Sequence, residues 1–407
     1  MRFRSMTPMG APRYGPPLPD GIVSPVGNGY GRGKTRGTRF VGMAEATKNI
    51  QAMVVGTSDV VATRIKAILQ RLPAVDVAAE ARDGVDAVSK LRQHAIDVIF
   101  IDIGDPQVKP TTDLSRLRRV DADIQIVMVA TLTFANVKNA MAGLVGGAAE
   151  FVQAPSKHTP HIVETDFNRQ IADLAQGLGR AHRDKSTRVI AAPAVTARFD
   201  HPEPAKGELR KRKPHRPKAI AIASSTGGPQ ALFTLFGGLA KDVRQPIFLT
   251  QHMPAGFTTA LADHIGRRAG WPCLEATDGM AVEGGNAYMA PGGFHMVPAK
   301  GPTGPVLRIN EGPEENFCRP SAEPMMRGVI DVYGAENVLM VVLTGMGSDG
   351  KAGAKAVADG GGTVVVQDKD SSIVWGMPGA VASAGNCHAV LPITEIADFI
   401  GKVARGQ

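Results

Sequence analysis

Three apolar runs in the sequence of 407 residues are followed directly by reactive side chains. Residues 219–232 read AIAIASSTGGPQAL, so the first run ends in a hydroxyl cluster that contains Ser225. The run IFLTQH ends at His252, and VVLTGMGSDG passes through a glycine-rich turn to Asp349. A hydroxyl, an imidazole and a carboxylate are the parts of an acyl-transfer triad. Serine needs an adjacent base to act as a nucleophile, and a carboxylate orients that base.

Alternating strands and helices are predicted around these residues, from residue 218 to residue 405. The apolar runs AIAIAS, PIFLTQH, NAYMAP, VLMVVLT and TVVVQD read as strands, and QALFTLFGGLA, FTTALADHIGRRA and GAKAVADG read as helices. Such alternation favours a doubly wound parallel sheet, whose ligand site lies at the carboxyl ends of the strands. We therefore expect Ser225, His252 and Asp349 to meet at one edge.

Glycine-rich turns follow two of these strands. Gly227 and Gly228 let the first turn present backbone N–H groups at a helix start, and TGMGSDG is a second turn of this kind. These N–H groups could form an oxyanion hole, in which one donor contributes about 3–4 kcal/mol. The residues alone leave ordinary loop and capping roles open. The order Ser, His, Asp and the absence of a G-x-S-x-G elbow match no common hydrolase template.

A second alternating pattern precedes the first in the chain. Residues 50–175 contain the strand-like runs NIQAMVV, VDVAAEA, AIDVIFIDIG and IQIVMVAT with helical segments between them, which predicts another doubly wound α/β domain. Residues 1–49 are expected to be a disordered basic tail and residues 176–217 a basic linker, because both stretches are rich in Pro, Gly and basic residues.

The amino-acid composition argues against a membrane-spanning protein and against a secreted, disulfide-rich protein. Hydrophobic residues make up 43% and charged residues 21%, as in soluble globular proteins, and no apolar run is long enough to span a membrane. No secretory signal is recognised, and three scattered cysteines suit a reducing cytoplasm rather than a disulfide framework or a zinc site. The net charge of +8 lies mainly in tail and linker, where a solubilising role is preferred to nucleic-acid or membrane binding.

Six motifs within residues 218–405 resemble those of a known family of enzymes. SSTGGPQAL, TQHMPAGFT, AYMAPGGFHM, RPSAEPMM, VVLTGMGSDGKAGA and VWGMPGA occur in this order and closely resemble the catalytic domain of bacterial chemotaxis protein-glutamate methylesterases. The resemblance implies a Rossmann-like methylesterase domain that hydrolyses glutamyl methyl esters on chemoreceptor signalling helices. It also implies deamidation of receptor glutamines in many members, and a need for no cofactor and no metal.

Residue roles follow from the same resemblance. It makes Ser225 the nucleophile, His252 the base and Asp349 the third member, with the backbone N–H of Met346 in the oxyanion hole and Thr226 beside the nucleophile. Two positions depart from the family pattern. Ser224 stands where alanine is usual, and Cys318 stands where many members have histidine. We expect Cys318 to be a small, half-buried residue rather than a second nucleophile.

The family's N-terminal domain is a response-regulator receiver of flavodoxin-like fold, and residues 50–175 have its layout. Asp102 in DVIFIDIGDPQ matches the phosphoacceptor, with Pro106 in its usual place. Receivers bind Mg²⁺ through an acidic pair after the first strand, but Gly56 and Thr57 stand there, with Asp59 displaced.

The hydroxyl and lysine positions of a receiver also differ in this chain. They hold Ala130 and Ala154. The sequence therefore predicts a degenerate receiver that keeps its fold, covers the esterase site and does not use Asp102 as a phosphoacceptor.

The sequence thus predicts a cytoplasmic serine hydrolase with chemoreceptors and the chemotaxis histidine kinase as partners. The alternative is a regulatory or scaffold protein with a constitutive receiver-like module and an esterase domain that is silent or acts elsewhere.

Overall fold

The computed structural model describes residues 49–58, 61–105, 108–131, 133–155, 161–190, 209–212 and 215–407. By their contacts, Thr47–Gln407 form one compact unit that contains two large parallel sheets. Of the helices in the described ranges, none is both long and apolar enough to cross a membrane.

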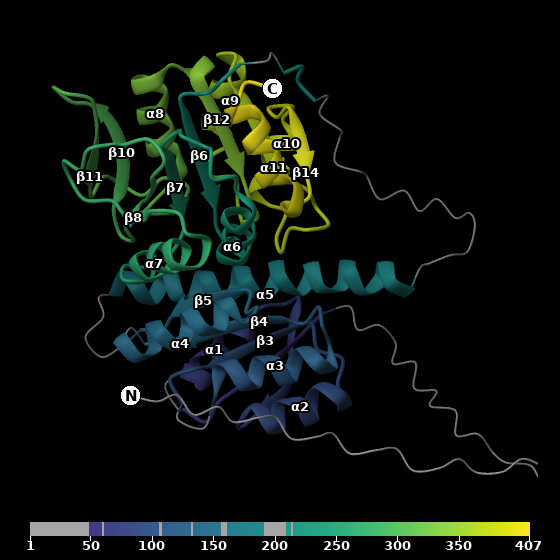
Figure 1. Cartoon of the computed structure of the whole chain (residues 1–407). Coiled ribbons are helices and arrows are strands. Elements are labelled where there is room, and N and C mark those ends of the chain that lie inside the picture. Colours follow the sequence, from purple (N-terminus) through teal and green to yellow (C-terminus); the bar gives the residue numbers. More distant parts are fainter. Residues whose placement is uncertain are drawn as a thin grey trace, which may run out of the picture. The chain divides into compact units, whose positions relative to one another are not determined.

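The first sheet has five parallel strands in the order β2-β1-β3-β4-β5, which is the flavodoxin-like order. Its strands are β1 (Ile50–Val55), β2 (Val75–Ala81), β3 (Val98–Asp102), β4 (Gln125–Ala130) and β5 (Glu150–Gln153). The helices between and after them are α1 (Val61–Leu69), α2 (Gly84–Gln93), α3 (Pro110–Val120), α4 (Phe134–Val145) and α5 (His161–Ile190). Helices α1 and α5 pack together on one face, and α2, α3 and α4 follow one another on the other (Figure 1).

The second sheet has seven parallel strands in the order β14-β13-β12-β6-β7-β9-β8. They are β6 (Ala219–Ser224), β7 (Ile247–Gln251), β8 (Cys273–Glu275), β9 (Ala287–Met289), β12 (Val338–Val342), β13 (Thr363–Gln367) and β14 (Ala389–Leu391). An antiparallel hairpin of β10 (His295–Lys300) and β11 (Pro305–Asn310) is separate from this sheet.

Helices cover both faces of the second sheet (Figure 1). One face carries α6 (Gly228–Gly238), α7 (Phe257–Ala269) and α11 (Ile393–Ala404), and the other carries α8 (Ala322–Tyr333), α9 (Lys351–Asp359) and α10 (Met377–Ser383). A 3₁₀ turn, η1 (Ala335–Asn337), leads into β12.

The central strands explain this layering. All residues of β3, β6, β7 and β12 are buried, so each strand is apolar on both faces rather than alternating. A strand of this kind needs helices on both sides, which parallel connections supply. The expected fold class, two doubly wound α/β domains, is therefore confirmed.

Helix α5 extends beyond the expected end of the first domain at residue 175. It continues to Ile190, so residues 176–190 are helical rather than linker. Its buried stripe includes Phe167, Ile171, Leu174 and Leu178, whose spacing of three to four residues keeps one face on the sheet. This stripe is visible in the sequence and marks the helix as continuing past residue 175.

Part of the expected linker also contacts the second half of the chain. Arg210 Nη1 lies 2.7 Å from Asp359 Oδ1, and the Arg210 backbone N–H donates to the Cys387 carbonyl at 2.9 Å. Arg216 Nε donates to the Ala404 carbonyl at 3.1 Å. In the described residues of the basic cluster, three arginines thus bind the protein itself, since Arg212 also donates to the Gln407 carbonyl. The basic tail of residues 1–48 lies outside the described residues.

Candidate active site

The end of β6 lies beside the ends of β7 and β12. Ser224 pairs with Gln251 in the register of β6 and β7, and Val342 pairs with Ala223 in that of β12 and β6. The strand order reverses beside β6, which is where doubly wound sheets bind their ligands. The residues that follow these strands therefore meet at one edge, and they include Ser225, His252 and the turn that leads to Asp349.

Close backbone packing fixes the serine turn. The Ser225 N–H donates to the Thr344 carbonyl at 3.0 Å, and Gln251 Nε2 donates to the Ser225 carbonyl at 3.0 Å. A Cβ on Gly345 would lie 2.8 Å from Ser225 Cβ, so only glycine lets the second turn approach this closely. Ser224 is fully buried, and its hydroxyl donates to Gln251 Oε1 at 2.7 Å. The two serines therefore differ, because Ser224 supports the turn through Gln251.

His252 and Asp349 form the charged pair of the site. Nε2 of His252 lies 2.8 Å from Asp349 Oδ2, and Nδ1 lies 3.3 Å from the sulfur of Cys318. Burial lowers the pKa of His252, but the Cys318 sulfur and the Asp349 carboxylate outweigh it and raise this pKa to about 10. In the described part of the chain, Ser225 Oγ makes no hydrogen bond to the ring. The structure thus brings the His252 imidazole and the Asp349 carboxylate together and leaves Ser225 without a hydrogen bond to the ring.

Asp349 is surrounded by donors that the sequence analysis did not identify. Its Oδ1 accepts from Ser321 Oγ at 2.7 Å and from Asn316 Nδ2 at 2.9 Å, and its Oδ2 accepts from the Ala322 N–H at 2.6 Å. Burial would raise the pKa of Asp349, but the bond to His252 and these donors hold it below its usual value. Ser321 also caps the N-terminus of α8. Its place in RPSAEP, directly before a helical segment, was the sequence feature that could have identified it.

Met346 and Thr226 flank the serine turn. No hydrogen bond within the described residues uses the Met346 backbone N–H, which leaves this donor open for an oxyanion. The Thr226 carbonyl accepts from Thr344 Oγ1 at 2.9 Å, which ties the two turns together. Thr226 itself is 4% exposed and Ser225 is 9% exposed. The serine turn is therefore covered in this structure.

Residues of the first half form the cover. The Gly227 N–H donates to the Ala149 carbonyl at 3.1 Å, and Phe151 stacks on Phe257 with ring centroids 4.2 Å apart. Between them, the Glu150 carboxyl bonds to Thr226 and to the Phe151 N–H. Burial raises the pKa of Glu150 to about 8. A Cβ at Gly177 of α5 would lie 2.9 Å from Met346 Cε. The N–H groups of Gly227 and Gly228 were expected to face substrate, but the first donates to the Ala149 carbonyl just before β5 and the second to the Ser225 carbonyl at 2.7 Å.

Asp102 lies at the end of β3, and the acidic pair and the lysine that accompany this aspartate in receivers are replaced here by Gly56, Thr57 and Ala154. Its Oδ1 accepts from the Gly104 N–H at 2.9 Å, and burial raises its pKa. Thr57 stands where an acid is expected, and both its N–H and its hydroxyl donate to Asp105 at 2.7 Å. Ala154 is buried. Asp59 and Pro106 lie outside the described residues.

A magnesium ion fits this donor set poorly, because Asp102 and Asp105 are its only described carboxylates and Thr57 already binds Asp105. Among the residues that the structure describes, no group of three or more His, Cys, Asp or Glu side chains could hold a metal ion.

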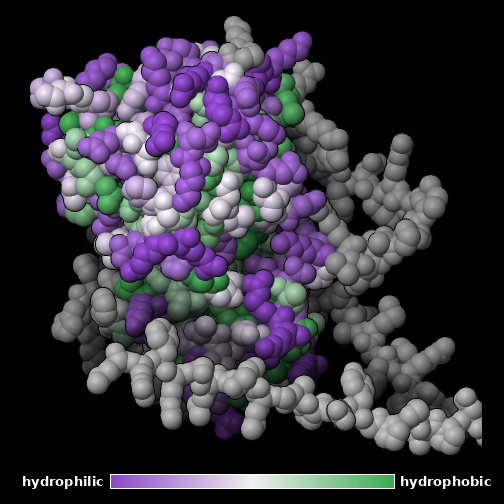
Figure 2. Space-filling model, viewed as in Figure 1, coloured by the Kyte–Doolittle hydropathy of each residue, from purple (hydrophilic) through white to green (hydrophobic). Residues whose placement is uncertain are grey.

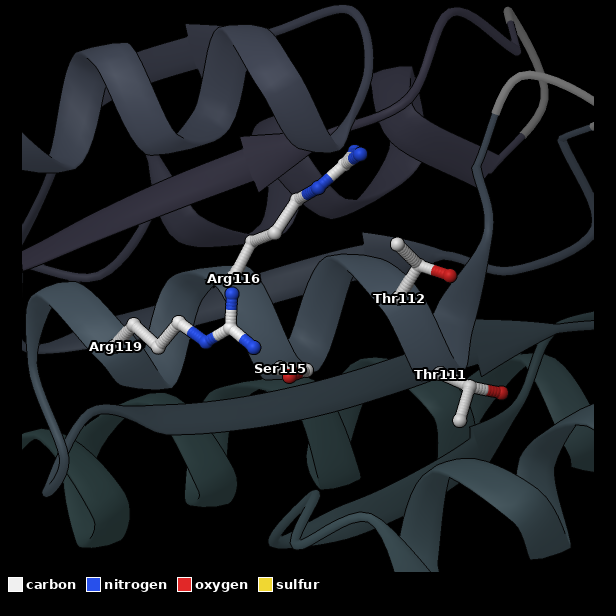
Figure 3. Close-up of a pocket in the computed structure, with 5 residues that line it drawn as sticks. All are labelled: Thr111, Thr112, Ser115, Arg116 and Arg119. Carbon is white, nitrogen blue, oxygen red and sulfur yellow. The ribbon is translucent and has the colours of Figure 1, made fainter. Parts of the chain in front are cut away.

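A shallow hollow lies on α3, and none of the site residues described above lines it. It has a volume of about 480 Å³ and is lined by Thr111, Thr112, Ser115, Arg116 and Arg119, all from one helix (Figure 3). The face seen in Figure 2 is mainly hydrophilic, with hydrophobic residues in small separate groups. Phe317 is the most exposed large hydrophobic side chain of the described residues, at 75%, and it precedes Cys318.

Fold and site together define a two-domain α/β protein with a hydrolase-type centre in its second domain. The family profile of CheB methylesterases matches residues 220–400, and that of response regulator receiver domains matches residues 52–164. A protein of Paramagnetospirillum magneticum called protein-glutamate methylesterase/protein-glutamine glutaminase 1 is 43% identical over 371 residues, covering 88% of this chain and 97% of the relative.

Two further similarities were found. A relative of the same name from Rhodospirillum rubrum is 43% identical over 365 residues, which cover 86% of this chain and 94% of the relative. The crystal structure of the Thermotoga maritima CheB methylesterase catalytic domain is 35% identical, with a TM-score of 0.44, and covers 46% of this chain and 98% of that one. The chain belongs to the family of protein-glutamate methylesterases/protein-glutamine glutaminases.

Proposed function

We propose that this chain hydrolyses glutamyl methyl esters on chemoreceptors, and deamidates glutamines there, through Ser225, His252 and Asp349. The observation that carries the proposal is the short contact between His252 Nε2 and Asp349 Oδ2, 2.8 Å, at the same sheet edge as the Ser225 turn. A buried, hydrogen-bonded carboxylate beside an imidazole is the arrangement that orients a general base.

The proposed reaction has two steps. Ser225 Oγ attacks the ester carbonyl carbon, and its proton passes to Nδ1 of His252, since Nε2 faces Asp349. The Met346 N–H donates to the oxyanion. The bond to the methoxy group breaks, and methanol leaves with the proton from Nδ1. Water, deprotonated by the same nitrogen, then attacks the carbonyl carbon of the glutamyl–Ser225 ester. The bond to Ser225 Oγ breaks, Oγ takes the proton from Nδ1, and the glutamate side chain is released. With glutamine, ammonia leaves in place of methanol.

The receiver-like domain inhibits this reaction by covering the serine turn. Ala149, Glu150 and Phe151 contact residues at or near the site, so substrate enters only after β5 moves away. We assign the protein to the cytoplasm and name the chemoreceptors and the chemotaxis histidine kinase as its partners, in line with the family.

The test is methanol release from methylated receptor membranes by the full chain and by Ser225→Ala. We expect the full chain to release methanol and the variant to lose at least about 10³-fold in rate with its thermal unfolding unchanged. Ser224→Ala is the matched control, because its hydroxyl binds Gln251. Retained activity in Ser225→Ala would refute the nucleophile, and absence of activity in every sample would favour the scaffold alternative.

A second proposal concerns Asp102, which we expect not to act as a phosphoacceptor. Thr57 in place of an acid and Ala154 in place of a lysine leave little to bind Mg²⁺ or the phosphoryl oxygens. Radiolabel from a small phosphodonor with Mg²⁺ should reach the full chain no more than it reaches Asp102→Ala. Labelling that exceeds this control would overturn the proposal.

A further inference from the structure

A strained turn presents Cys318 to the base. Asn316 and Phe317 both have positive φ angles, 53° and 61°, although neither is glycine. The turn is closed by backbone bonds between Glu315 and Cys318, of 3.3 Å and 3.0 Å. Such backbone angles cost free energy and persist where surrounding contacts impose them, often at functional sites.

The side chains on either side of Phe317 contact both charged members of the site. Asn316 Nδ2 donates to Asp349 Oδ1 at 2.9 Å, and the sulfur of Cys318 lies 3.3 Å from Nδ1 of His252. Phe317 points outward, with the Arg169 guanidinium 5.1 Å from its ring centroid. The strained turn thus binds Asp349 through Asn316 and His252 through Cys318.

The contact between Cys318 and His252 affects whether His252 can accept the proton of Ser225. With Nε2 on Asp349, only Nδ1 is left to accept the serine proton. A Cys318 thiol that donates to Nδ1 occupies its lone pair, and a proton that has moved from sulfur to Nδ1 leaves an imidazolium beside a thiolate. In both states Nδ1 cannot accept a proton from Ser225.

We propose that Cys318 is a positioning residue of the esterase site: its thiol holds Nδ1 of His252, the nitrogen that Ser225 needs, and so determines the orientation and proton occupancy of the base. The proposal rests on the proposed hydrolytic function, and it goes beyond the small packing residue that the sequence indicates. The effect acts through His252, so Cys318 itself forms no bond to substrate.

The other two cysteines provide an internal comparison. Cys273 and Cys387 are buried, and burial raises the pKa of their thiols to about 12 and about 11. Cys318 is half-buried and is the one cysteine of the three that contacts a histidine among the described residues. A thiol-directed reagent should therefore distinguish Cys318 from both.

The first measurement is the pH dependence of methanol release by the full chain, Cys318→Ala and Cys318→Ser. Removing the thiol removes one cause of the raised His252 pKa, so the acid limb should move to lower pH by at least about one unit in the alanine variant. At neutral pH kcat should rise several-fold, with KM changed less than about twofold. The serine variant should lie between, because its hydroxyl can still donate to Nδ1 in place of the thiol. An unmoved acid limb in both variants would overturn the proposal.

The second measurement does not depend on esterase activity. Iodoacetamide alkylates a thiol when sulfur attacks its methylene carbon and iodide leaves, and His252 Nδ1 takes the thiol proton. Mass spectrometry should find Cys318 modified well before Cys273 and Cys387. In His252→Gln and His252→Phe the rate at Cys318 should fall about tenfold or more.

The two readouts separate the possible failures. Labelling of Cys318 at the wild-type rate in both histidine variants would refute the coupling, even in an active esterase. Labelling that depends on His252 in a protein that releases no methanol would support the coupling and count against the proposed hydrolysis alone.

Discussion

Glu150 should make the cover of the active site sensitive to pH. This carboxyl is 8% exposed and faces the Thr226 hydroxyl, the Phe151 N–H and the charge of His252. Burial raises its pKa from 4.5 to about 8, so the covered state binds a proton that the open state releases at neutral pH. The contribution of protonated Glu150 to the stability of the covered state is therefore complete below pH 4.5, and it is lost as the pH rises toward 8.

The magnitude follows from these two pKa values. Each pKa unit corresponds to about 1.4 kcal/mol, so the cost of covering Glu150 is about 2 kcal/mol at pH 6 and about 4 kcal/mol at pH 8. The difference is roughly 2 kcal/mol, or about a thirtyfold shift toward the open state. Glu150→Gln removes the titration and keeps the size of the side chain, so its covered state should be favoured at neutral pH and independent of pH.

Hydrogen exchange at Gly227 measures this equilibrium directly, because its N–H donates to the Ala149 carbonyl across the contact. After correction for the intrinsic pH dependence of exchange, protection of the 224–230 peptide should fall from pH 6 to pH 8 in the wild type and stay constant in Glu150→Gln. Methanol release by the variant, divided by that of the wild type, should fall over the same range. Glu164→Gln changes a half-exposed glutamate of α5 that pairs with Arg64, and it is the control. Equal pH dependence in all three proteins would refute the reasoning.

Two further predictions concern the site and its turn. Asp349→Asn should lower kcat by about 10⁴-fold, because an amide beside Nε2 no longer stabilises the charged base; its NH₂ would also face donors such as Ser321. Methanol release checks this, with Asp359→Asn on the exposed surface as control, and a loss below tenfold would count against the triad. Gly228→Ala should reduce stability by about 1–3 kcal/mol, because its Cβ would lie 1.9 Å from Gln251 Oε1, whereas Gly237→Ala in the same helix meets nothing within 4 Å. Denaturant unfolding of both variants tests the difference, and equal stabilities would contradict the packing argument.

Local patterns in the sequence determine the fold class and the candidates for the site. Runs such as VIFID and VLMVV are apolar throughout, and such strands are stable only inside a sheet covered on both faces. Because parallel strands end at one edge, the residues after three of them had to lie near each other. The nature of Ser225, His252 and Asp349 then indicated acyl transfer before any contact was known.

Only the tertiary structure decided which partner each of these groups has. Nδ1 of His252 faces Cys318, and Asp349 is bonded by Asn316 and Ser321, none of which a periodicity reveals. Glu150 reaches the serine turn from a strand about 75 residues earlier, and α5 continues past the expected boundary. These contacts join segments far apart in the chain, and they depend on how side chains of two sheets pack together. Hydrophobic pattern fixes the face that a residue occupies, whereas its partner on that face is selected by shape, hydrogen bonding and charge.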